Sequence, residues 1–197
     1  MPSRRLLAWV SVPLLAAAFV VLRGEGAEEG AGIHGYREIE WIDLLPDGDF
    51  EALMNPPAWV DEVEEGSAAD MLDAADFMGD PESRRYFEAL NSADVVERWV
   101  RKPIRIPGFI VPLEFDHRQR VTEFFLVPYF GACIHLPPPP PNQMIHVRYP
   151  EGLSLARLED AFWVEGMLGA SVTAHALGTS AYDLEGHRIR PWILEGP

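Results

Sequence analysis

The spacing of hydrophobic residues changes its period about halfway along the chain. Residues 81–90 carry their apolar side chains on one helical face, a spacing that predicts a helix. From Lys102 onward apolar and polar residues alternate, and this period of two predicts strands. The change divides the chain into an N-terminal extension, residues 36–100, and a β-domain, residues 101–197.

The β-domain contains several short apolar or alternating stretches, and glycines inside them indicate bends. The expected strands cover residues 104–115, 121–127, 145–149, 162–168, 172–177, 181–184 and 189–194. Leu153, Leu155 and Leu158 predict a short helix between the third and fourth strands, and residues 185–187 predict a turn. This pattern is typical of a small OB-like β-barrel, the oligonucleotide/oligosaccharide-binding architecture, with a β-sandwich as the alternative. We therefore expect a mainly β protein.

The N-terminal extension is expected to be acidic and partly helical. Residues 36–45 favour a short strand or extended segment that buries Trp41 and Leu44. Residues 47–80 are acidic and poor in aliphatic side chains, which is typical of a solvated, partly ordered linker. The extension should therefore consist of a strand, an acidic linker and the helix at residues 81–90.

The first residues have the pattern of an export signal. Arg4 and Arg5 precede an apolar run over residues 6–22, and a basic start followed by such a run is typical of a signal peptide. The run is also long enough to span a bilayer, so residues 1–26 are either a signal peptide or an uncleaved membrane anchor. Residues 27–35 are expected to form a flexible leader.

Charge and cysteine content narrow the function. The formal net charge of −15 and the lack of a basic stripe argue against nucleic-acid binding, because the phosphates would be repelled. Cys133 is the only cysteine, so it has no partner for a disulfide within the chain. It is therefore a free thiol, half of an intermolecular disulfide, a metal ligand or a small buried hydrophobe.

The loop that follows the second expected strand concentrates the candidate chemistry. Cys133 and His135 lie two positions apart, so in an extended chain their thiolate and imidazole point the same way. Such a pair is suited to zinc or another transition metal. Glu114 and His146 are candidates for the further ligands, and His175 is a weaker one. Alternatively, Cys133 is a core residue and His135 hydrogen-bonds a carbonyl.

The same loop, residues 128–143, supports two other interpretations. A nearby imidazole could activate Cys133 as the nucleophile of a thiol-dependent enzyme, although no oxyanion-hole motif is recognisable. The proline run favours a polyproline II segment, whose preformed surface could dock a partner with little loss of entropy. The candidate partner-binding residues are Pro137, Pro138, Pro139, Pro140, Pro141, Asn142 and Gln143.

Four stretches of the sequence resemble one protein family. They are Trp41 with Leu44, PGFIVPLE at residues 107–114, FFLVPYFGACIHLPPPPPNQ at residues 124–143, and FWVEGML at residues 162–168. With these motifs the chain resembles DUF3299, a family of exported bacterial proteins of unknown function. The resemblance implies an OB-like β-barrel, located in the periplasm or anchored to the outer face of the inner membrane. It also implies an accessory role beside an ABC transporter of the lipoprotein-exporter type, or metal handling, because some members are encoded in zinc-responsive gene clusters.

The residues and the resemblance together lead to one expected function. We expect an exported accessory or binding protein, not an enzyme, that works with ABC-transporter subunits. We also expect it to bind a transition metal, zinc above all, through Cys133 and His135. A thiol-dependent enzyme and a purely structural interaction module are the alternatives.

Overall fold

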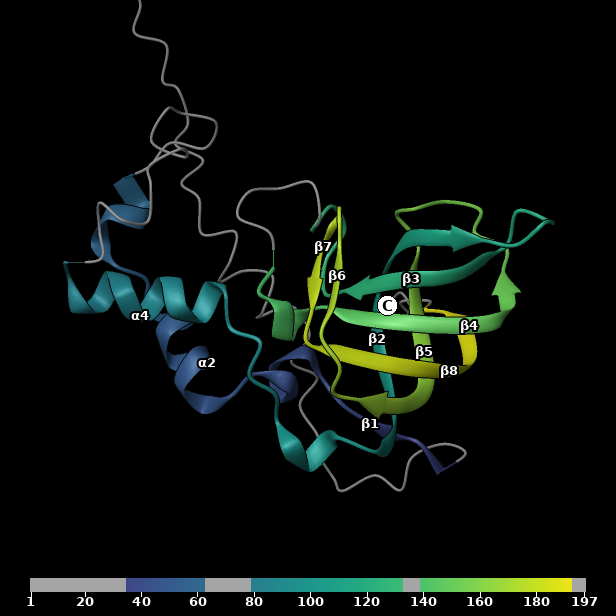
Figure 1. Cartoon of the computed structure of the whole chain (residues 1–197), viewed down its shortest axis with the longest axis horizontal. Coiled ribbons are helices and arrows are strands. Elements are labelled where there is room, and N and C mark those ends of the chain that lie inside the picture. Colours follow the sequence, from purple (N-terminus) through teal and green to yellow (C-terminus); the bar gives the residue numbers. More distant parts are fainter. Residues whose placement is uncertain (1–34, 63–78, 133–138, 193–197) are drawn as a thin grey trace, which may run out of the picture.

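The computed structural model describes residues 35–62, 79–132 and 139–192. A β-barrel forms one end of the molecule, and two helices of the N-terminal extension stand beside it (Figure 1). The expected export segment, Cys133, His135, Pro137 and Pro138 lie outside the described residues. Within the three described ranges, every helix is too short or too polar to cross a bilayer.

Five strands close into the barrel. They are β2 (Lys102–Phe115), β3 (Val121–Val127), β4 (Ile145–Leu153), β5 (Ala161–Gly169) and β8 (Tyr182–Pro191). Neighbouring strands follow the order β2–β3–β4–β8–β5, and β5 pairs again with β2, which closes the sheet. All of these pairs are antiparallel except β4 with β8. The structure therefore confirms the mainly β, OB-like barrel.

β2 closes the barrel because it pairs with two strands in succession. Its first half pairs with β5 and its second half with β3, and Phe109 is the position shared by both registers. Gly108 stands at this crossing, where an added Cβ would lie 2.8 Å from both the Leu126 side chain and the Val127 carbonyl oxygen. The glycine therefore permits the close approach of β2 and β3 that the bend requires.

Side chains that alternate along the strands fill the barrel interior. The buried ones from the barrel strands are Ile104, Ile106, Ile110, Val121, Phe124, Leu126, Ile145, Val147, Phe162, Val164, Leu168, Tyr182 and Leu184. Trp41 and Leu44 of the extension join the same core, and the Trp41 indole N–H donates a 2.6 Å hydrogen bond to the Pro107 carbonyl. Residues between the core positions point outward, and they form the faces considered below.

The extension consists of short elements packed beside the barrel. β1 (Arg37–Glu38) pairs in parallel with β2. The two helices, α2 (Asp47–Met54) and α4 (Pro81–Leu90), contact each other. The described part of the extension also contains three short 3-10 helices: η2 (Trp41–Leu44), η3 (Ala58–Glu62) and η5 (Glu97–Trp99).

The helix expected at residues 81–90 is confirmed, but the acidic linker is wrong over its first part. Residues 47–54 form α2 instead, because Asp47 and Asp49 fall in its first turn, where the helix dipole stabilises acidic side chains. Trp41 and Leu44 are buried as expected, although they lie on a 3-10 helix and not on an extended segment.

Three local expectations for the barrel are also wrong. Residues 154–160 run through turns without forming the short helix, and Leu155 packs on the core from this loop. Residues 185–187 continue β8, because the ladder with β5 extends through Gly186. The strand expected at residues 172–177 is shorter, because only β6 (Thr173–His175) is a strand and the chain then turns. β6 pairs with β7 (Gly178–Ser180) in a hairpin separate from the barrel sheet.

Candidate functional site

The outer surface of β3 and β4 carries a second apolar cluster. Phe125 and Val127 of β3 point away from the barrel core, as does Met144 just before β4, and all three are buried. Partly buried Phe109, Val111, Leu113 and Tyr129 surround them. We call the surface formed by Glu123, Phe125, Val127, Met144 and His146 the β3–β4 face.

The loop that leaves β3 packs on this face. Ala132 is fully buried and belongs to the same cluster as Phe125 and Val127. Its N–H donates to the Tyr129 carbonyl in a turn, at 3.4 Å. Ala132 is also the last described residue before Cys133 in the chain.

His146 is the buried polar residue of the β3–β4 face, with 7% of its surface exposed. Its Nε2 lies 3.1 Å from Oε2 of Glu123. Its ring also stands edge-on to Phe125, with the ring centroids 6.0 Å apart. His175 of β6 approaches the same phenyl ring at 6.1 Å and accepts a 3.2 Å hydrogen bond from the Leu177 N–H at Nδ1. Two imidazoles therefore stand against the ring of Phe125, and one of them, His146, also contacts the Glu123 carboxylate.

Glu114 is exposed and lies at the other end of β3 from the proline loop. It pairs with Glu123 across a β-bulge, just before the turn that joins β2 to β3. In that turn the backbone N–H of Arg120, together with the N–H of Arg118 and the Arg120 side chain, lowers the pKa of Asp116 to about 2. Glu114 and His146 are both expected metal ligands, but within the described residues neither belongs to a group of three or more His, Cys, Asp or Glu arranged for a metal.

The C-terminal half of the proline loop is buried and makes hydrogen bonds within the chain. Pro139 and Pro140 are buried, and a 3-10 turn, η6 (Pro141–Gln143), leads into β4. Asn142 Nδ2 donates to Asp49 Oδ2 at 2.8 Å, and Gln143 Nε2 donates to the Trp41 carbonyl at 3.0 Å. Asn142 and Gln143 therefore hold the extension against the barrel instead of presenting their amides at an outer surface.

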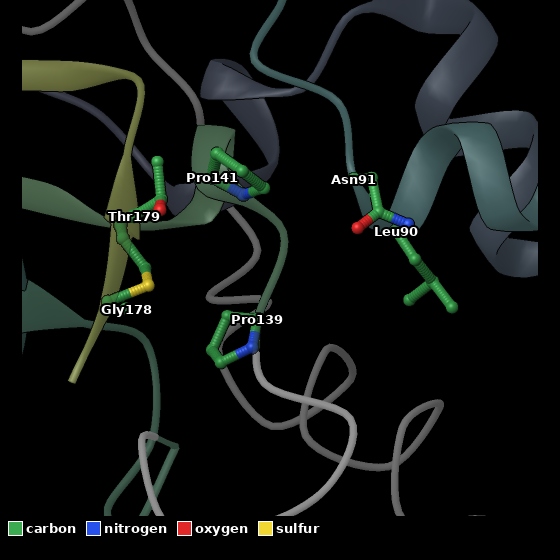
Figure 2. A pocket seen from close by; sticks show the side chains of 7 residues that line it. Leu90, Asn91, Pro139, Pro141, Gly178 and Thr179 are labelled. Atoms are coloured by element: carbon green, nitrogen blue, oxygen red, sulfur yellow. The ribbon is translucent and has the colours of Figure 1, made fainter. Parts of the chain in front are cut away.

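A small open pocket of about 190 Å³ lies where α4, the proline loop and the β6–β7 hairpin meet (Figure 2). Its lining residues are Leu90, Asn91, Pro139, Pro141, Met144, Gly178 and Thr179. An added Cβ at Gly178 would lie 2.8 Å from Met144 Cε, so the hairpin packs directly on that methionine. Met144 belongs both to this pocket and to the β3–β4 face, so the two surfaces are continuous.

Glu123 is the member of the site that sequence reasoning missed. Its signal was present in the alternation, since it lies two residues before Phe125 and shares the outward side of the same strand. The partners of Asn142 and Gln143 lie about a hundred residues earlier in the chain, and their pairing with the extension had no local signal.

The barrel order and the location of this face define the chain as an OB-like β-barrel protein, whose second and third barrel strands form the surface used for binding in that architecture. The chain belongs to the DUF3299 family, described as proteins of unknown function, whose family model matches residues 41–191. It is similar to the crystal structure of a DUF3299 family protein from Pseudomonas aeruginosa PAO1. The two share 32% sequence identity with a TM-score of 0.57, and the match covers 82% of this chain and 99% of the other. No curated protein matches the sequence.

Proposed function

We propose that this protein is an exported accessory protein that binds a partner protein through the β3–β4 face and its apolar rim. OB-like barrels use the face of their second and third strands for binding, and here those strands are β3 and β4. The partner that the family resemblance implies is a subunit of an ABC transporter. The role we propose is binding, since the His146–Glu123 pair on this face lies beside buried and partly buried apolar side chains.

The observation that carries the proposal is the apolar rim of the face. Phe130, which is 52% exposed, stands 6.2 Å from the ring of Phe109. Val111 and Leu113 extend the rim along β2 and are only partly buried. Apolar side chains gathered at one surface of a protein with net charge −15 favour a docking site for another protein.

A crosslinking pull-down with matched variants tests this function. Phe130→Ala should reduce recovery of the transporter subunit about tenfold, the loss expected of an exposed aromatic anchor. Met54→Ala is the control, because Met54 is 40% exposed but lies on α2, away from the face. Equal recovery with both variants, or no recovery with the parent chain, would reject the proposal.

A second candidate function is transition-metal binding through Cys133 and His135, with His146 as a third ligand. The observation that favours it is that Ala132, the residue before Cys133, belongs to the cluster of Phe125, whose ring also contacts His146. A thiolate with two imidazoles is a ligand set that zinc accepts.

The metal content of the purified protein tests this second function. The parent chain should carry about one zinc ion after purification, and Cys133→Ser, His135→Ala and His146→Ala should each lower that content. His117→Ala is the control, because this exposed histidine lies in the turn between β2 and β3. A parent chain without metal, or variants that keep it, would leave the face as a protein-binding surface alone.

A further inference from the structure

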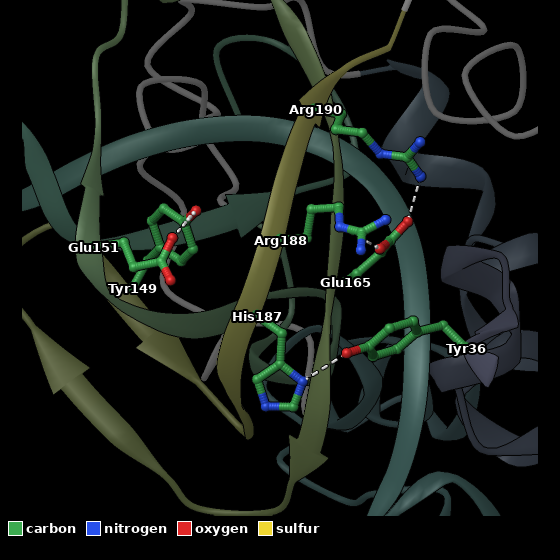
Figure 3. Close-up of polar contacts among 7 residues, drawn as sticks. All are labelled: Tyr36, Tyr149, Glu151, Glu165, His187, Arg188 and Arg190. Carbon is green, nitrogen blue, oxygen red and sulfur yellow. Dashed lines mark hydrogen bonds and ion pairs between the residues drawn. The ribbon is translucent and has the colours of Figure 1, made fainter. Parts of the chain in front are cut away.

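The outer face of β2, β5 and β8 carries a buried carboxylate surrounded by arginines. Glu165 of β5 is fully buried and stands opposite Arg188 of β8, whose Nε lies 3.7 Å from its Oε2. Arg190 donates from Nη2 to the other carboxylate oxygen (Figure 3). On the other side of Glu165 the opposite residue is Arg105 of β2.

Arg105 forms the buried floor of this cluster. Its guanidinium carbon lies 3.9 Å from the ring centroid of Trp163, and only 7% of the residue is exposed. Its Nε is 3.6 Å from Oε2 of Glu38, a distance that makes an ion pair and not a hydrogen bond. Among the residues that the structure describes, Nε of Arg105 and Nε of Arg190 are buried without a hydrogen-bond acceptor, and Oε2 of Glu165 is buried without a hydrogen-bond donor.

The charges in this cluster do not balance. Three guanidinium groups, those of Arg105, Arg188 and Arg190, face two carboxylates, those of Glu165 and Glu38. The surplus is positive, in a chain whose net charge is −15. Like charges held together in a partly buried site repel one another, and another anion relieves that repulsion.

The two outer arginines are accessible to such an anion. The side chains of Arg188 and Arg190 are 45% and 43% exposed, so each keeps N–H groups on the solvent side while it pairs with Glu165. The planar fork of an arginine matches the oxygens of carboxylate and phosphate groups. The buried carboxylate of Glu165 pairs with both guanidinium groups from the protein side.

We propose that Arg105, Arg188 and Arg190 form a binding site for the oxyanion group of a small ligand, a carboxylate or a phosphate. The outer N–H groups of Arg188 and Arg190 contact the anion, and Arg105 supplies positive charge from the floor. The site is separate from the β3–β4 face, because it lies on β2, β5 and β8. It therefore stands or fails independently of the proposed function.

The test is an NMR titration of the full chain that follows the Nε–Hε signals of Arg105 and Arg190. Inorganic phosphate and citrate are the two probes, and sodium chloride at matched ionic strength is the reference. We expect saturable shifts with at least one probe and none with chloride. Saturation by phosphate alone assigns a phosphate ligand, and saturation by citrate alone assigns a carboxylate. Shifts that merely follow ionic strength overturn the proposal.

Two variants with opposite expected effects separate a binding site from a purely structural ion-pair network. Arg188→Gln should weaken binding of the probe about tenfold, since it removes a charged fork. Glu165→Gln should tighten binding about threefold, since it removes the competing negative charge. Arg148→Gln is the control: Arg148 is 56% exposed on β4 and pairs with Asp183 at 3.5 Å. If Arg188→Gln changes the affinity no more than Arg148→Gln does, the proposal is wrong.

Discussion

Nε2 of His146 lies 3.1 Å from Oε2 of Glu123, and this contact runs diagonally between neighbouring strands. In the register of β3 and β4, His146 is opposite Phe125, whereas Glu123 is opposite Arg148. The imidazole is therefore held on one side by a phenyl ring and on another by a carboxylate that is 40% exposed. The contact fixes the one buried polar side chain among the residues of the β3–β4 face.

His146→Ala should lower the free energy of unfolding by about 1 kcal/mol, the value of an edge-to-face ring contact. The contact with Glu123 adds little, because that carboxylate is 40% exposed and screened by solvent. Urea denaturation measures the change. His117→Ala should leave the midpoint unchanged, and an equal loss in both variants would show that His146 has no special packing role.

The hydroxyl of Tyr182 joins the barrel to the extension. It donates to the Leu44 carbonyl at 3.0 Å and accepts from the Val96 N–H at 2.7 Å, and the residue is fully buried. Tyr182→Phe leaves both backbone groups without their partner, so it should destabilise the protein by about 1–3 kcal/mol. Thermal and urea denaturation test this. An unchanged stability would mean that water replaces the hydroxyl.

Tyr182 should also make the protein sensitive to alkali. Burial raises the pKa of Tyr182 from 10.0 to about 12. The folded state therefore keeps its phenolic proton where the unfolded chain has lost it, so this stabilisation is complete below pH 10 and disappears as the pH rises toward 12. The parent chain should lose more stability than Tyr182→Phe between those two values. Parallel pH profiles for the two proteins would contradict the assignment.

Gly108→Ala should destabilise the barrel by about 2 kcal/mol or more, because its Cβ would meet the backbone oxygen of Val127 at 2.8 Å. Gly48→Ala is the matched control: it lies in α2, where an added Cβ meets nothing within 4 Å. That change should stabilise the protein slightly, since alanine favours a helix over glycine. Denaturation midpoints that move in the same direction would argue against the strand crossing at Gly108.

The strands could be predicted from sequence where one face is buried in the barrel. Alternation along β2, β3 and β5 follows directly from that burial. Gly186 misled the prediction, because a glycine after Glu185 has the pattern of a turn, yet here it continues the ladder opposite Gly166. The sequence did not indicate α2 because its acidic composition is typical of a solvated linker, whereas the acidic side chains of its first turn and its packing on α4 stabilise a helix.

The candidate site could be predicted only in part. The sequence identified His146, but Glu123 and the ring contacts of Phe125 depend on the diagonal geometry of two strands. Asn142 and Gln143 are candidates for a partner-binding loop on sequence grounds. In the structure their amides bond to the extension, a contact that the sequence does not indicate because the two segments lie about a hundred residues apart. The metal-ligand roles of Cys133 and His135 stay predictions.

The most direct test of the binding face is photo-crosslinking in intact cells. A photoreactive amino acid at position 130 should form a crosslink to a subunit of the ABC transporter, identified by mass spectrometry. The same amino acid at position 54, on α2, should not form it. Crosslinks to that subunit from both positions, or from neither, would contradict the account.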